Sequence, residues 1–451
     1  MIFAEQAFLA TGWAARVRVV IAEGAISAVT PDTAPQPGDV CVETLLPALS
    51  NLHSHSFQRA MAGMTEHRAA GQDSFWTWRD LMYRFTARLT ADHIEAIAAQ
   101  TFMEMQEAGF AAVGEFHYLH HQPGGAPYDD PAELSQRIFA AAEGTGIGLT
   151  HLPVLYSHGG AGGQPLAVGQ LRFGTTPDQY ARLLDASRSA AKRLPADTRV
   201  GIAPHSLRAT DPEGLAAILL LAGGNPIHIH IAEQPKEVAD ITGWLGARPV
   251  EWLLDHADVG PDWCPIHATH MTAEETRRLA QTGAIAGLCP ITEANLGDGP
   301  FNGPGWRAAQ GGFGVGSDSN IRISMVEELR TLEYSQRLRD LARNVLTDAG
   351  STGETLYAAA SQGGAQALGR HAGQIAPGFL ADLTAIDHTH PTLCPLTPAN
   401  LLDGLIFAAP DSVVTDVWSA GRHMVRAGRH IHRDRITGNW RRAVRSLMAD
   451  L

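Results

Sequence analysis

The sequence predicts an α/β fold, a (β/α)8 TIM barrel with a small β-sandwich domain formed by both termini. Short apolar runs that end in polar residues recur through the middle of the chain, with helical segments in most of the intervals between them. Both ends of the chain instead carry short, alternating, strand-like segments. Strand–helix alternation repeated eight times over about 270 residues has the size and rhythm of such a barrel.

Residues 1–47 are expected to form the N-terminal part of the β-sandwich. Residues 16–22 and 23–29 meet at Glu23-Gly24, which predicts two antiparallel strands around a glycine turn. Residues 372–451 are expected to supply the other part, because 381–387, 413–418 and 423–428 have the same pattern. A basic segment over 433–445 predicts a closing helix packed on the body.

Residues 48–371 are expected to form the barrel. Its predicted strands end near residues 52, 114, 155, 203, 230, 266, 289 and 315. Helical periodicity occurs near 92–108, 177–193, 211–222, 237–256, 272–282 and 324–346. An open, doubly wound sheet is the alternative, but the first strand–helix turn has no glycine fingerprint for it.

Composition excludes several functional classes. The chain has 451 residues with 34 basic and 47 acidic side chains, a formal charge of −13, which argues against a nucleic-acid partner. Its apolar stretches fall short of the roughly 20 residues that a membrane span needs, and the N-terminus lacks the features of a secretory signal. The four cysteines are scattered, as expected for a protein of a reducing compartment. We therefore expect a soluble, cytoplasmic protein with no membrane partner.

Histidines and acids gather where the barrel strands end. His53 and His55 close the first strand and, being two residues apart, share one face. The fifth strand carries His228 and His230, followed by Glu233, while His267 ends the sixth strand and Asp318 the eighth. The carboxyl ends of barrel strands meet on one face, where active sites are built. Imidazoles and a carboxylate gathered there predict a divalent-metal site.

Each of these features alone has a plainer explanation. A His-x-His pair is often ordinary core packing, Glu233 can cap the next helix, and Asp318 can be a turn residue at a strand end. Their occurrence together, on four strands that end at one face, is not explained in this way. The joint pattern therefore favours a metal-dependent hydrolytic site.

This pattern resembles the amidohydrolase superfamily over essentially the whole chain, including the C-terminal segment 373–383. The resemblance implies that His53, His55, His230 and Asp318 bind one divalent metal per subunit. Zinc is the favoured ion, although iron, manganese and cobalt accept the same ligands. Strand 4, at 200–205, has no lysine to bridge two metals, so a mononuclear site is expected. His228 is the second candidate for the strand-5 ligand.

Closer motifs resemble the N-formimidoyl-L-glutamate deiminase family of histidine degradation, and they lie at 55–63, 75–83, 115–121, 203–209 and 289–299. The resemblance implies hydrolysis of N-formimidoyl-L-glutamate to N-formyl-L-glutamate and ammonia, by a homodimer. This small-molecule substrate has two carboxylates, for which Arg79 and Arg208 are the candidate ligands. Gln58, Tyr118 and His205 are the candidate hydrogen-bonding partners.

The expected mechanism assigns three catalytic residues. Asp318 accepts the proton of a metal-activated water, His267 holds and polarises that water, and Glu233 moves a proton to the departing nitrogen. Two alternatives stay open. Another deaminase of the superfamily, acting on guanine or a related heterocycle, would need stacking aromatics and amides in place of paired arginines. A barrel-shaped scaffold without catalysis would be expected to have lost ligands, yet all of them are present.

Overall fold

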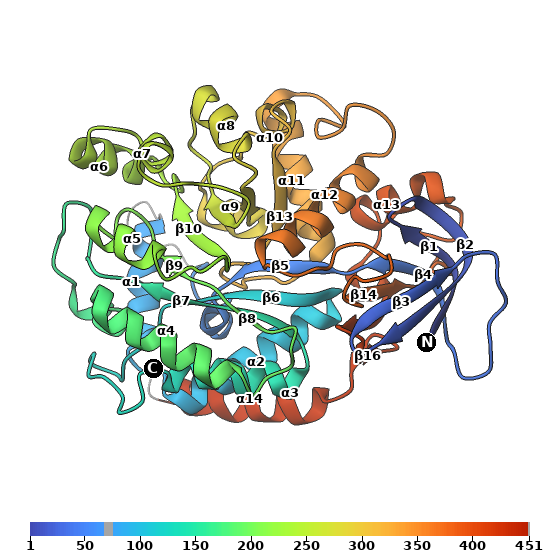
Figure 1. Ribbon diagram of the computed structural model, residues 1–451, viewed down its shortest axis with the longest axis horizontal. Helices are drawn as coiled ribbons and strands as arrows, with labels where there is room; N and C mark the ends of the chain where they lie inside the picture. Colours follow the sequence, from blue (N-terminus) through green and yellow to red (C-terminus); the bar gives the residue numbers. More distant parts are fainter. Residues whose placement is uncertain (67–74, 450–451) are drawn as a thin grey trace.

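The computed structural model describes residues 1–66 and 75–449, and it confirms a barrel joined to a β layer that both termini build. Figure 1 shows the layer at one side of the molecule, where strands from the start of the chain (blue) lie beside strands from its end (red). The barrel and its helices form the rest of the structure. The boundaries between the three predicted regions stay predictions.

The β layer is one hydrogen-bonded sheet with the strand order β17-β16-β15-β14-β4-β1-β2-β3. Its strands are β1 (Ile2–Leu9), β2 (Gly12–Ala22), β3 (Ala25–Thr30), β4 (Val40–Pro47), β14 (Leu383–Ile386), β15 (Val414–Ser419), β16 (Arg422–Arg426) and β17 (Arg429–His430). β4 joins the two chain ends, because it pairs in parallel with β1 and antiparallel with β14. The layer has a small apolar core of its own, which includes Val17, Val19 and Trp418.

The barrel strands follow one another in chain order. They are β5 (Leu49–Ser54), β6 (Phe110–His117), β7 (Gly148–Leu155), β8 (Arg199–Val200) with β9 (Ala203–Pro204), β10 (Ile227–Ile231), β11 (Trp263–His267), β12 (Ile285–Leu288) and β13 (Gly312–Val315). The fourth position is split into two short pieces, β8 and β9. Parallel bridges from Ile202 to Ile227 and from Ser54 to Asp318 link the two runs of strands at both seams.

Glycine at position 316 lets the last strand approach the first. A Cβ atom there would lie 2.7 Å from both the backbone nitrogen and the backbone oxygen of His53. With glycine in place, the amide of Asp318 donates to His53 O and the amide of His55 donates to Asp318 O, both at 2.9 Å. The seam between β5 and β13 therefore runs directly beside three of the predicted site residues.

Helices follow most of the strands, as predicted. They are α1 (Phe75–Thr86), α2 (Ala91–Glu107), α3 (Glu133–Thr145), α4 (Pro177–Ala191), α5 (Pro212–Leu219), α6 (Pro235–Leu245), α7 (Pro249–His256), α8 (Ala273–Ala280), α9 (Pro290–Leu296), α10 (Gly303–Ala308), α11 (Met325–Asp340), α12 (Thr352–Ala367), α13 (Pro398–Phe407) and α14 (Arg433–Met448). Three short 3-10 segments, η1 (Ser56–Met61), η2 (Val168–Gln170) and η3 (Asp411–Val413), complete the set. No helix in the described ranges is both long and apolar enough to span a membrane.

Two helices differ from the sequence prediction. The single helix expected over 237–256 is two helices, because Gly246 takes a left-handed conformation that ends α6 and Pro249 begins α7. The helix expected over 324–346 ends at Asp340, where Leu341 turns left-handed. The closing helix is present as α14, and its Thr437 donates a hydrogen bond to Gln100 of α2.

A buried ion network ties the barrel to the β layer. Arg370, which follows α12, forms hydrogen bonds to both carboxylate oxygens of Asp382, just before β14. It also donates to Asp197, in the loop before β8. Arg370→Met should lower the free energy of unfolding by about 3–5 kcal/mol, because it leaves these buried carboxylates without their cation. Urea unfolding followed by tryptophan fluorescence measures the change.

A matched control is Arg277→Met, which removes an exposed arginine from its surface pair with Glu274. Exposed pairs contribute little to stability, so its unfolding midpoint should stay near that of the parent protein. Equal midpoints for the Arg370 and Arg277 variants would contradict the role of the buried network.

Candidate metal centre

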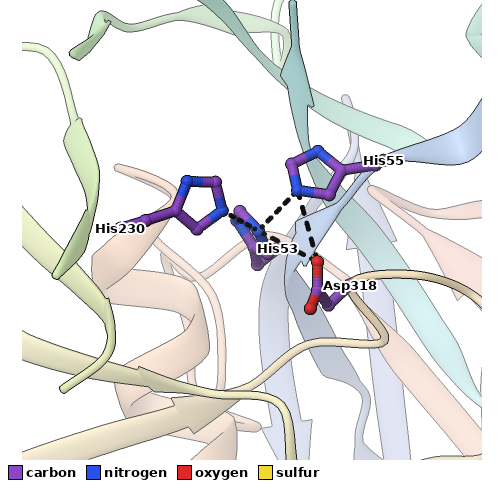
Figure 2. Close-up of side chains that lie close together, drawn as sticks. All are labelled: His53, His55, His230 and Asp318. Atoms are coloured by element: carbon purple, nitrogen blue, oxygen red, sulfur yellow. Dashed lines mark hydrogen bonds and ion pairs between the residues drawn. The ribbon is translucent and has the colours of Figure 1, made fainter. Parts of the chain in front are cut away.

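Four donor side chains from three parts of the barrel meet at its carboxyl-terminal face. His53 and His55 come from the end of β5, His230 from β10 and Asp318 from the turn after β13 (Figure 2). The Nε2 atom of His53 lies 3.2 Å from that of His55 and 3.0 Å from that of His230. Asp318 Oδ1 lies 3.4 Å from His53 Nε2 and 3.2 Å from His55 Nε2. All four side chains are buried.

Backbone carbonyls fix the tautomers of two of these rings. His55 Nδ1 donates to Phe116 O at 2.9 Å, and His230 Nδ1 donates to His205 O at 3.0 Å. A carbonyl can only accept, so the hydrogen of each neutral ring is on Nδ1. The Nε2 lone pairs therefore point at the common centre, which is the orientation that metal-binding histidines take.

The charge states also fit a divalent cation. Burial lowers the pKa of His53 to about 3 and holds the pKa values of His55 and His230 below the usual value, so these rings are neutral. Burial alone would raise the pKa of Asp318, but the hydrogen bond with His53 and the nearby imidazoles outweigh it and keep the carboxylate ionised. The Nε2 lone pairs of His55 and His230 and the Asp318 carboxylate face one another beside the His53 ring, and they repel unless a cation lies between them. The donor set therefore fits a bound metal.

His228, the second candidate on the fifth strand, is used differently. Its Nε2 donates to the carbonyl of Ala367 at 2.8 Å, at the end of α12. Within the described residues the four-donor group contains His230 and not His228.

His267 and Glu233 lie beside the four donors. His267 Nε2 is 3.9 Å from Glu233 Oε1 and 3.9 Å from Asp318 Oδ2. Burial disfavours the imidazolium, but the hydrogen bond to Glu293 and the charges of Glu233 and Asp318 raise the pKa of His267 to about 10. The three predicted catalytic residues therefore lie close together, with Glu233 and His267 beside the metal donor Asp318.

Sequence reasoning gave Glu293 no role, although it lies in the motif at 289–299. Glu293 Oε1 accepts a hydrogen bond from His267 Nδ1 at 3.2 Å and another from the amide of Cys289 at 2.8 Å. The first bond directs His267 Nε2 towards Asp318. An acid in the first turn of the helix after a barrel strand was the available signal, and it is easily taken for a helix cap.

A pocket opens over this centre. Gln58, Arg79, Tyr118, His205 and Arg208, the five predicted substrate-binding residues, all line it. Gln58 Nε2 donates to the Tyr118 hydroxyl at 2.8 Å, and the His205 ring packs 4.6 Å from that of Tyr156.

Aromatic residues that the sequence did not single out complete the pocket wall: Trp78, Tyr83, Tyr156 and Phe173. The guanidinium carbon of Arg79 lies 5.5 Å from the centre of the Tyr83 ring, within range of a cation–π contact. The wall thus combines apolar rings with two arginines.

Arg208, which lines the pocket, lies against two acidic side chains. Its Nη2 donates to Glu233 Oε2 at 2.9 Å, and its Nε is 3.8 Å from Glu237 Oε2. Burial opposes the charge of Arg208, yet Glu237 and Glu233 raise the pKa of its guanidinium above the usual value. The arginine predicted to bind a substrate carboxylate is therefore also a partner of the predicted proton carrier.

Three residues beside the site have left-handed backbone conformations that are uncommon outside glycine. The φ angles are +66° at His267, +45° at Asp318 and +52° at Ala232, which precedes Glu233. Such conformations cost on the order of 1–3 kcal/mol each, and they concentrate at functional sites. The barrel holds its predicted catalytic side chains in directions that a relaxed strand end would not give.

Comparison with known proteins places these observations in a family. A model of the amidohydrolase family matches residues 44–424, and a model described as "Formimidoylglutamate deiminase HutF, N-terminal domain" matches residues 1–41. The chain is 49% identical over 438 residues to a formimidoylglutamate deiminase of Pseudomonas aeruginosa, a match that covers 96% of each protein.

Solved structures agree. A crystal structure of an amidohydrolase from Brucella melitensis is 46% identical, with a TM-score of 0.95 and 99% of each chain covered. An adenosine deaminase from Xanthomonas campestris with bound zinc, at 22% identity and a TM-score of 0.82, covers 99% of this chain and 98% of its own. At that identity the second likeness shows a shared fold.

Proposed function

The chain belongs to the amidohydrolase family, and on that premise we propose that it hydrolyses N-formimidoyl-L-glutamate to N-formyl-L-glutamate and ammonia in histidine degradation. The observation that carries the proposal is the pocket itself. It joins a buried group of four metal donors to two arginines, and this suits a substrate with one amidine and two carboxylates.

His53, His55, His230 and Asp318 would hold one divalent ion per subunit, with zinc favoured. When bound, the ion supplies Lewis acidity, which lowers the pKa of a water molecule from 15.7 to about 7. Metal analysis of the purified protein gives the identity and the number of ions. The centre has four donor side chains per subunit, so we expect one ion to bind there.

The chain's own residues carry the proton transfers. Asp318 accepts the proton of the attacking water, and His267 Nε2 orients that water towards the formimidoyl carbon. The water oxygen adds to this carbon, and the bond to the terminal nitrogen breaks. That nitrogen leaves as ammonia with both protons of the water, one taken up first by Asp318 and one passed on by Glu233. Glu233 delivers a proton to the departing nitrogen, a transfer that its position near His267 in the pocket lining supports.

Arg79 and Arg208 are proposed to bind the two carboxylates, with Gln58, Tyr118 and His205 as hydrogen-bonding partners. Arg208 also contacts Glu233, so a carboxylate bound there would hold the substrate in a fixed relation to the proton carrier. Binding and proton delivery are then coupled through one guanidinium.

Arg79→Met should lower kcat/KM for N-formimidoyl-L-glutamate by about 30-fold or more, because losing one partner of a desolvated charge pair costs about 2 kcal/mol or more. Steady-state ammonia release measures it. Arg84→Met is the matched control, since Arg84 lies on the same helix but is exposed. Both variants should release ammonia from formamidine at the same rate, because formamidine has no carboxylates. A full kcat/KM in the Arg79 variant would remove this residue from substrate binding.

Ammonia release from a substrate panel tests the function itself. N-formimidoyl-L-glutamate should be hydrolysed, and guanine and other aminated rings should not. Activity on a ring without activity on N-formimidoyl-L-glutamate would assign the protein to the alternative deaminase class. A folded, metal-free protein with no hydrolysis would instead favour a scaffold.

We further propose that the protein works as a homodimer in the cytoplasm. The four cysteines are all unpaired, which suits a reducing compartment. Light scattering on the purified protein gives the number of subunits, and fractionation of the producing cells gives the location.

A further inference from the structure

A second set of possible metal donors lies next to the first. His267, Cys289 and Asp318 each offer one ligand atom, and these atoms all lie within 4.8 Å of one another. All three side chains are buried. His267 ends β11, Cys289 follows β12 and Asp318 follows β13, so three consecutive strand ends supply the group.

Asp318 presents one oxygen to each donor set. Its Oδ1 faces His53 and His55 at 3.4 and 3.2 Å, whereas its Oδ2 lies 3.9 Å from His267 Nε2. A carboxylate in this position can bridge two cations. Glu293 accepts the Nδ1 hydrogen of His267, and this carboxylate–histidine arrangement is the one that prepares Nε2 to bind a metal.

The donor types and their spacing suit zinc. Zinc binds imidazole nitrogen and carboxylate oxygen at about 2.0–2.2 Å and thiolate sulfur at about 2.3 Å, so tetrahedral geometry places the donors roughly 3.3–3.6 Å apart. The donors of this group, which lie within 4.8 Å of one another, therefore need to approach each other by at most about 1.5 Å. Three protein ligands leave one position of the tetrahedron open.

The surroundings favour added positive charge. The carboxylates of Glu233 and Glu293 lie within 4 Å of the His267 ring nitrogens. Burial and, next, repulsion from Glu233 raise the pKa of Asp298, and Glu293 and Asp318 add to the repulsion. A second cation in this region would relieve part of that repulsion.

We propose that His267, Cys289 and Asp318 form a second, inhibitory zinc site beside the first metal. Binding there releases two protons, the thiol proton of Cys289 and the Nε2 proton of His267, since thiolate and neutral imidazole are the ligand forms. The second ion would occupy His267 Nε2, to which the proposed function assigns water orientation, and an oxygen of Asp318, to which it assigns proton acceptance. Only the inhibition rests on that function, because the binding itself follows from the donor geometry.

Metal binding tests the site without any substrate. For these experiments the parent protein is a variant with Cys41→Ser and Cys394→Ser, two substitutions that remove the exposed thiols. Equilibrium dialysis against Zn²⁺ should give two ions per subunit for this parent and one for its Cys289→Ser variant. Titration with Cd²⁺ should produce the ultraviolet charge-transfer absorption of a cadmium–thiolate bond in the parent only.

Cys264→Ser is the matched control, because Cys264 is a second buried thiol that lies outside the donor group. It should keep both the second ion and the cadmium absorption. Cys289→Ala serves as a second variant if the serine variant does not fold. One zinc ion per subunit in the parent, or a cadmium–thiolate absorption that survives both Cys289 replacements, would overturn the proposal.

Inhibition supplies the second readout. Excess Zn²⁺ should inhibit the parent protein, and Cys289→Ser should need at least about tenfold more zinc for the same inhibition, because it loses the thiolate that selects this ion. Activity at low zinc should be unchanged, since the thiol takes no part in the proposed reaction. Equal zinc sensitivity in both proteins would overturn the inhibitory role. If neither protein hydrolyses the substrate, the proposed function fails while the metal counts still decide the site.

Discussion

Asp318→Asn is expected to lower kcat/KM by at least about 10⁴-fold. Asp318 is the one anionic donor among the four, so its amide would weaken metal binding, and an amide cannot accept the proton of the attacking water. Loss of proton transfer alone lowers the rate by about 10²–10⁴-fold. Weaker metal binding lowers it further, because the Lewis acidity of the ion is lost. Ammonia release and metal content, measured on the same preparation, separate the two losses.

The control carries the same chemical change outside the donor group. Asp211 caps the first turn of α5 through a hydrogen bond to the amide of Gly214. Asparagine caps helices about as well as aspartate, so Asp211→Asn should keep its metal and its rate. An Asp318→Asn protein with a full metal complement and the parent rate would contradict both roles of Asp318.

Glu233→Gln is expected to reduce kcat by at least about 10²-fold while the metal stays bound. Glutamine keeps the shape of the side chain and can still accept a hydrogen bond from Arg208, but it cannot carry a proton to the departing nitrogen. Glu233 is not among the four donors, so metal content should match that of the parent. Steady-state kinetics and metal analysis give the two numbers.

Glu237→Gln is the matched control, because it removes a negative charge near Arg208 without removing the predicted proton carrier. Glu237 also faces Arg208, at 3.8 Å, but its carboxylate accepts hydrogen bonds from the amides of Ala232 and Glu233 and does not line the pocket. Removing its charge should therefore change kcat much less than Glu233→Gln does. A Glu233→Gln protein with the parent kcat would remove Glu233 from the reaction.

The positions of the four donors could be predicted because they depend on few local rules. Alternation along β5 puts His53 and His55 on one face, and the barrel brings the carboxyl ends of its strands together. Sequence spacing therefore limited the possibilities to His228 or His230 on β10. The hydrogen bond from His228 to Ala367 depends on a helix far along the chain, which no local pattern reveals.

The pairing of Arg208 with Glu233 could not be predicted either, because no local sequence pattern reveals it. Arg208 was chosen for the carboxylates of the expected substrate, and Glu233 for its place among the histidines and acids at the strand ends. Only the packing of adjacent strand ends shows that they touch. Glu293 likewise gains its role from His267, which ends the preceding strand. The break between α6 and α7 is different, because Gly246 and Pro249 were visible signals that a continuous apolar pattern had outweighed.

The closing seam of the barrel gives the metal centre a place in the folding of the chain. His53 and Asp318 lie on the first and last strands, and their backbones are bonded to each other across that seam. A nascent chain therefore cannot assemble the donor set until synthesis has passed the eighth strand and that strand has returned beside the first. Metal uptake then occurs late in folding, and the bound ion stabilises the closed barrel over partly folded forms that lack the site.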